Sequence, residues 1–91
     1  LALLDREDAG QLTAPDQINR SRALRTLGEV MMEEANLEQA HTAFVGADRA
    51  ARAAALSAPD SQEAIAEAGI AAYWLGYYHF RRNEFAEARP G

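Results

Sequence analysis

The sequence predicts an all-α protein built from antiparallel helix hairpins. Apolar residues recur at helical spacing through most of the chain, and no segment alternates with a period of two. The stretch 72–88, AYWLGYYHFRRNEFAEA, also reappears in weaker form at 24–40 as LRTLGEVMMEEANLEQA. The 91 residues suffice for one small domain or a piece of a longer protein. We expect a piece, because the chain starts without Met and stops inside the second copy.

Composition and charge exclude several function classes. The formal net charge is −5, and phosphate contacts need a basic surface, so we expect no nucleic-acid partner. The absence of Cys excludes disulfides and thiolate metal sites. The longest largely apolar run, 68–78, is too short to span a membrane, so we expect no membrane partner. No targeting signal is readable, and we expect a cytoplasmic location.

The first predicted helix follows a segment, 1–12, that is either a tail or the end of a preceding helix. Thr13 is placed to cap it, Pro15 suits its first turn, and Asp16 occupies the position of a capping-box acid. We therefore predict a helix over 15–34. Its expected apolar face comprises Ala23, Leu24, Leu27, Val30 and Met31.

The second predicted helix runs over 37–57 behind the cap Asn36, and Pro59 ends it. Small residues dominate its expected buried stripe, which lets two helix backbones come close. The stripe comprises Leu37, Ala40, Phe44, Ala47, Ala51, Ala54 and Ala58. Charged residues on the opposite side, among them Glu38, Arg49 and Arg52, indicate a solvated face.

The third predicted helix starts at the cap Asp60 and continues to about Arg82. Its expected buried stripe is Ile65, Ala68, Ala72, Leu75 and His79. Gly69 and Gly76 lie beside this stripe. A glycine costs about 1 kcal/mol inside a helix, so we expect each to contact another helix. Asn83 is the expected terminator, and a truncated fourth helix is expected from Glu84.

These residues resemble the tetratricopeptide repeat, whose pattern is W-x2-L-G-x2-Y followed by A-x3-F and P. In the first copy the positions of this pattern are occupied by Leu24, Leu27, Gly28, Met31, Ala40, Phe44 and Pro59. In the second they are occupied by Ala72, Leu75, Gly76, His79, Phe85 and Ala88. The resemblance implies a fragment of a right-handed α-superhelix of about four helices, with hairpins at 15–58 and 60–91 inside a domain at 13–91. The runner-up fold is a plain four-helix bundle.

The departures from the pattern point to a long-helix variant. The expected Trp is replaced by Leu24 and Ala72, the expected Tyr by Met31 and His79, and the turn Gly by Ala35 and Asn83. Compared with the tetratricopeptide repeat, this chain has about seven extra residues on each side of Pro59. Seven residues are nearly two whole helical turns. Helices can lengthen in this way without rotating their buried stripes. A similar long-helix subclass occurs in large bacterial multidomain proteins.

The resemblance implies a concave surface lined by the first helix of each hairpin. The candidate partner-binding residues on or beside this surface are Arg22, Arg25, Glu29, Tyr73, Trp74, Tyr77, Phe80 and Arg81. The primary hypothesis is a non-catalytic scaffold module that binds a peptide, a partner protein or neighbouring repeats of the same chain. The alternative is a segment that dimerises through the aromatic face of the third helix.

We expect no enzyme activity, cofactor or metal. Glu38 and His41 form one E-x-x-H pair, but a di-iron bundle site needs a second pair and two further acids. His41 is interpreted as a surface residue and His79 as a core histidine. The small basic patches, Arg20–Arg25 and Arg81–Arg82, are interpreted as partners of nearby acids at i, i+4 spacing.

Overall fold

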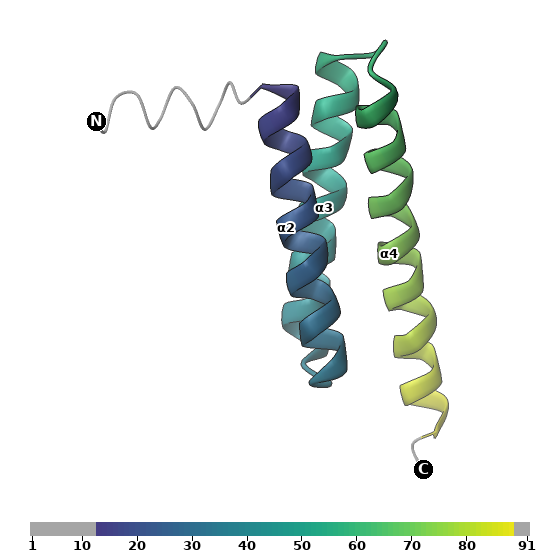
Figure 1. The fold of residues 1–91 in the computed structure, drawn as a ribbon. Helices are drawn as coiled ribbons and strands as arrows, with labels where there is room; N and C mark the ends of the chain where they lie inside the picture. The colour runs from purple at the N-terminus through teal and green to yellow at the C-terminus, as the bar shows by residue number, and fades with distance from the viewer. Residues whose placement is uncertain (1–12, 89–91) are drawn as a thin grey trace, which may run out of the picture.

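The computed structural model describes residues 13–88 and consists there of three helices, which confirms the all-α fold class. They are α2 (Ala14–Glu33), α3 (Leu37–Ser57) and α4 (Gln62–Ala88). The expectations for residues 1–12 and for the Pro90-Gly91 end fall outside the described residues. Helices α2 and α3 form an antiparallel hairpin, and α4 lies beside it, parallel to α2 (Figure 1).

The helix ends follow local chemistry. The Thr13 hydroxyl accepts the N–H of Asp16 at 3.3 Å, and the Asn36 side chain accepts the N–H of Gln39 at 3.4 Å, so both predicted caps are confirmed. The predicted cap Asp60 is wrong. Ser61 caps α4 instead, accepting the N–H of Ala64 at 3.1 Å.

The turn between α2 and α3 has left-handed backbone at a residue that is not glycine. Ala35 has φ 59°. Its N–H donates to the Met32 carbonyl at 3.0 Å, and the Asn36 N–H donates to the Met31 carbonyl at 2.8 Å. These two bonds form a Schellman motif, which normally has glycine at this position. The turn therefore has the left-handed geometry expected of a Gly, although the residue is Ala35.

The core changes in composition along the hairpin. Near the α3–α4 connection it consists of Ile18, Ala54 and Ala64, and its middle consists of Ala47, Ala51 and Ala71. Near the α2–α3 turn it becomes aromatic, with Phe44 and Tyr78 buried and Trp74 packed against them. Alanines allow close approach and aromatic rings hold the helices apart. The C-terminal end of α4 extends past the end of the hairpin (Figure 1).

The buried stripe of α3 is confirmed. Its residues from Ala40 to Ala54 are buried, while Leu37 and Ala58 at the two ends are half-buried. The face of α2 was predicted less well. Ile18, Ser21 and Gly28 are its buried residues, whereas Leu27 and Val30 remain exposed. Gly28 is required where it lies, because a Cβ there would be 2.5 Å from the Phe44 ring.

Two expectations for α4 are wrong. The helix continues through Asn83 without a turn, so no fourth helix begins at Glu84. Asn lacks the helix-breaking power of Pro, and an ion pair of 3.0 Å between Arg81 and Glu84 spans the expected break.

The predicted buried stripe of α4 is also displaced. Ala68 and Leu75 of this stripe are half-buried and pack against the core. Ile65, Ala72 and His79 are exposed, and the residues one position earlier, Ala64, Ala71 and Tyr78, are buried. Glu67 is buried among them. Apolar residues occur all round this helix, so their spacing could not identify the side that faces α2 and α3.

Candidate functional site

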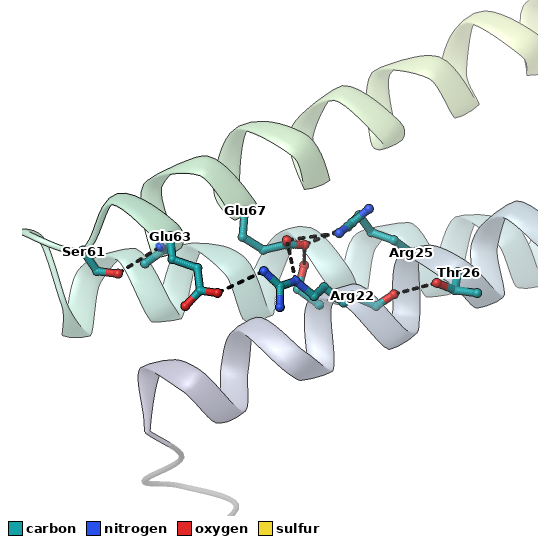
Figure 2. Close-up of polar contacts among 8 residues, drawn as sticks. Arg22, Arg25, Thr26, Ser61, Glu63 and Glu67 are labelled. Carbon is teal, nitrogen blue, oxygen red and sulfur yellow. Dashed lines mark hydrogen bonds and ion pairs between the residues drawn. The ribbon is translucent and has the colours of Figure 1, made fainter.

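A buried carboxylate joins α4 to α2. Glu67 is only 2% exposed, and its Oε2 accepts hydrogen bonds from the Ser21 hydroxyl and from Arg25 Nε, each at 2.7 Å. Arg25 Nη2 donates to the other oxygen at 3.1 Å, so the Arg25–Glu67 pair is bidentate. Figure 2 shows Arg22 and Arg25 reaching from α2 toward Glu67 on α4.

Arg22 is shared between two acids of α4. Its Nη2 lies 3.1 Å from Glu63 Oε2, and its Nε lies 3.6 Å from Glu67 Oε1. The Glu63 pair is exposed to solvent and the Glu67 pair is partly shielded. The expected i, i+4 pairing of Arg22 and Arg25 within their own helix is therefore replaced by pairing between helices.

Sequence reasoning did not single out Glu67. The available signal was its isolation, because it is the only Asp, Glu, Lys or Arg between Ala64 and Phe80. A carboxylate in such an apolar segment is costly to bury without a cationic partner. The partners come from a helix distant in sequence, so only the folded arrangement identifies them.

The predicted aromatic residues lie on α4 but have different surroundings. Trp74 is half-buried and stacks on Phe44, with ring centroids 6.0 Å apart. Tyr73 and Tyr77 meet the Trp74 ring edge-on, at 5.7 and 5.5 Å. Tyr73 and Phe80 are 65% and 60% exposed. The aromatic group thus runs from the core at Trp74 to solvent at Tyr73 and Phe80.

The exposed aromatics belong to a larger apolar surface on α4. We call it the outer face of α4 and define it as Ile65, Gly69, Ile70, Tyr73, Gly76 and Phe80. All six residues are exposed. Within the described residues, a methyl group added at Gly69 or Gly76 would meet no atom within 4 Å, so the expected helix contacts at these glycines are not made here. No other part of residues 13–84 therefore covers the outer face at these glycines.

The remaining predicted site residues do not join this surface. Glu29 is half-buried on α2, one turn after Arg25. Arg81 pairs with Glu84 at the far end of α4. The structure thus separates the predicted site into a charged group on α2, which faces α4, and an aromatic group on α4.

The two histidines form a small ring cluster with Tyr78. The His41 ring stacks on Tyr78 with centroids 5.1 Å apart, and the His41 and His79 centroids are 5.9 Å apart. His41 is half-buried and His79 is exposed, so the interpretation of His79 as a core histidine is wrong. In the part of the chain that the structure describes, no three His, Cys, Asp or Glu side chains are grouped as metal ligands would be.

Among the described helices, none is long and apolar enough to cross a membrane. Comparison of the chain with protein-family models, with curated proteins and with solved structures gave no match.

Proposed function

We propose that this chain is a non-catalytic protein-interaction module whose partner binds the outer face of α4. The observation that carries the proposal is the uncovered apolar surface between Glu63 and Arg81. Ile65, Tyr73 and Phe80 on this surface are 51%, 65% and 60% exposed. Contiguous exposed apolar surface of this kind marks interaction sites in proteins.

The aromatic side chains of this region are held in place by packed neighbours, which favours binding. Tyr73 and Tyr77 rest against Trp74, and Trp74 is stacked on the buried Phe44. Aromatic side chains held by a packed neighbour lose little conformational entropy when a partner covers them. A helix or peptide with apolar anchors at helical spacing is the kind of ligand that such a face accepts.

The arrangement of the helices is compatible with a tetratricopeptide-like module. In that family the first helices of successive hairpins line one surface. Here α2 and α4 would take those positions, since they run parallel and are joined by the ion pairs of Glu67. On this proposal Arg22 and Arg25 fix the spacing of the two helices, and the aromatic residues of α4 contact the partner.

Selection from a displayed library of random peptides tests the proposal. We expect the wild-type chain to enrich peptides with aromatic or aliphatic anchors. The double variant Tyr73→Ser/Phe80→Ser should weaken their binding by at least about tenfold, as expected when exposed anchors of an interface are removed. Both residues are exposed, so the helical content should be unchanged.

The matched control is Leu56→Ser, which removes an 84% exposed side chain from α3. It should bind the selected peptides as the wild type does. The proposal is wrong if no peptide is enriched, or if the double variant binds the enriched peptides as well as the control.

A further inference from the structure

We propose that His41 and His79 form a two-histidine site for a divalent transition-metal ion such as Zn²⁺. The observation that carries the proposal is the meeting of the two histidines of this sequence, one from α3 and one from α4, with their ring centroids 5.9 Å apart. The site uses neither Tyr73 nor Phe80, so it goes beyond the proposed function and stands independently of it.

Imidazole is the side chain of this sequence that is best suited to a transition ion. The 91 residues include two histidines and no cysteine. Imidazole nitrogens suit Zn²⁺, Cu²⁺ and Ni²⁺, whereas carboxylates and water suit Mg²⁺ and Ca²⁺. The fold therefore brings together both of the side chains that could select a transition ion over the commoner alkaline-earth ions.

The separation of the two rings fits a shared ion. Zinc lies about 2.0–2.1 Å from a ligating imidazole nitrogen, and hence about 3 Å from the centre of the ring. Two rings on one ion therefore have centroids about 5–6 Å apart, depending on the angle at the metal. The 5.9 Å between His41 and His79 lies within this range, and the ring planes are inclined by 64°. His79 is exposed, so its side chain can rotate to direct a nitrogen at an ion that His41 also binds.

One histidine is held in place and the other is accessible. The half-buried His41 ring stacks on Tyr78 with centroids 5.1 Å apart, and Tyr78 itself is only 2% exposed. A side chain that is held in this way loses little conformational entropy when it binds. Within the described residues, no hydrogen bond or ion pair engages either imidazole, so each neutral ring has a nitrogen lone pair for a metal.

The site is distinct from the di-iron pattern that the sequence lacks. Glu38 precedes His41 by three positions and so lies on the same side of α3. No acid in the part of the chain that the structure describes forms a three-membered ligand group with the two histidines. Water therefore fills the remaining coordination positions, as it does at metal sites with few protein ligands.

An ion at this site joins α3 to α4 at the end of the fold that lies away from their connection (Figure 1). Such a cross-link restricts the chain between the two histidines in the unfolded state. An ion that binds only the folded chain also stabilises it by mass action. The helix that the ion holds in place is α4, because α3 is already packed against α2.

Calorimetric titration of the metal-free, untagged 91-residue chain with ZnCl₂ tests the inference. We expect one Zn²⁺ per chain. At a zinc concentration about a hundredfold above the dissociation constant, the melting temperature should rise by at least about 5 °C. The same concentration of MgCl₂ should leave the melting temperature unchanged, because Mg²⁺ prefers oxygen ligands.

Single variants then test the ligand set. His41→Phe keeps an aromatic ring over Tyr78, and His79→Gln changes an exposed side chain, so both should retain the helical content of the wild type. Each should raise the dissociation constant for Zn²⁺ at least about tenfold, because one imidazole remains. The matched control is Glu38→Gln, which should change the dissociation constant by less than about threefold.

The inference is overturned if the wild-type chain binds no Zn²⁺ at millimolar concentration, or if either histidine variant binds it within about threefold of the wild type. A loss in Glu38→Gln as large as that in the histidine variants would also overturn the two-histidine ligand set. So would one Zn²⁺ per two chains with a zinc-dependent dimer in sedimentation, since the two ligands would then come from different chains. Peptide selection is unaffected by any of these outcomes, so the proposed function is tested separately.

Discussion

The carboxylate of Glu67 accepts hydrogen bonds from Ser21 and Arg25 while it is almost entirely removed from water. A buried ion pair adds little net stability when intact, because desolvation offsets the attraction. Removing one member is different, since the other charge is then left without compensation. The Arg25 side chain, 19% exposed, would be that uncompensated charge.

Glu67→Gln is therefore expected to lower the free energy of unfolding by about 3 kcal/mol. The matched control is Glu63→Gln, which breaks an exposed pair with Arg22 and should cost less than about 1 kcal/mol. Urea denaturation followed by circular dichroism measures both. Equal losses for the two variants would contradict the structural role of Glu67.

Among single residues, the sequence predicted those whose contacts are with residues nearby in the chain. It did not predict those whose contacts are with residues distant in the chain. The caps Thr13 and Asn36 act on backbone only three residues away. Glu67 acts on a helix more than forty residues away. The aromatic residues were located on the correct helix, but only the fold shows that Trp74 packs on Phe44 while Tyr73 remains in solvent.

Among the elements, α3 was predicted almost residue by residue and α4 was not. The faces of α3 differ strongly, with small apolar residues on one side and Glu38, Arg49 and Arg52 on the other. Such a contrast identifies the buried side without knowledge of the partner helix. The faces of α4 are both apolar, so the spacing of its residues predicts a helix but not its orientation. The fold class was thus predictable, whereas only Tyr73 and Phe80 of the outer face of α4 were among the predicted site residues.

The end of α2 allows a test at the scale of the element. Ala35 adopts φ 59°, and left-handed backbone costs a residue with a Cβ about 1–2 kcal/mol. Ala35→Gly should remove this cost. The greater freedom of Gly in the unfolded chain cancels part of the gain. We expect a net increase of about 0.5 kcal/mol in the free energy of unfolding, measured by thermal and urea denaturation.

The control for this prediction is Ala58→Gly at the end of α3, where φ is −135°. No left-handed strain exists there, so only the unfolded-state effect remains and the variant should be destabilised. A loss of stability in Ala35→Gly comparable to that of Ala58→Gly would contradict the assigned turn geometry.

In the whole molecule, α3 occupies the central position. Its buried stripe packs on both α2 and α4, and it contributes more buried residues than α2. Exposing α3 therefore requires the loss of both neighbours, whereas α4 can separate while the α2–α3 hairpin stays intact.

Native-state hydrogen exchange should show this order. We expect the amides of α3 between Phe44 and Ala54 to exchange at least about tenfold more slowly than those of α4 between Ala64 and Tyr78. The comparison is to be made at a concentration where the chain is monomeric, so that a second copy cannot protect α4. Equal protection of the two helices would show that the three helices open only as one unit.

The Phe44 ring over Gly28 has a consequence for how the hairpin aligns. The α3 stripe consists mostly of alanine, at Ala40, Ala47, Ala51 and Ala54, and three of these, Ala40, Ala47 and Ala54, recur seven residues apart. Such a repetitive surface could slide along α2 by a whole heptad at little energetic cost, giving several near-degenerate alignments. The ring fits only where α2 has no Cβ, and in the described part of α2 that occurs at Gly28 alone. The contact between Phe44 and Gly28 thus selects one axial alignment of α2 and α3. The alanines alone would leave the alternative alignments almost equal in energy.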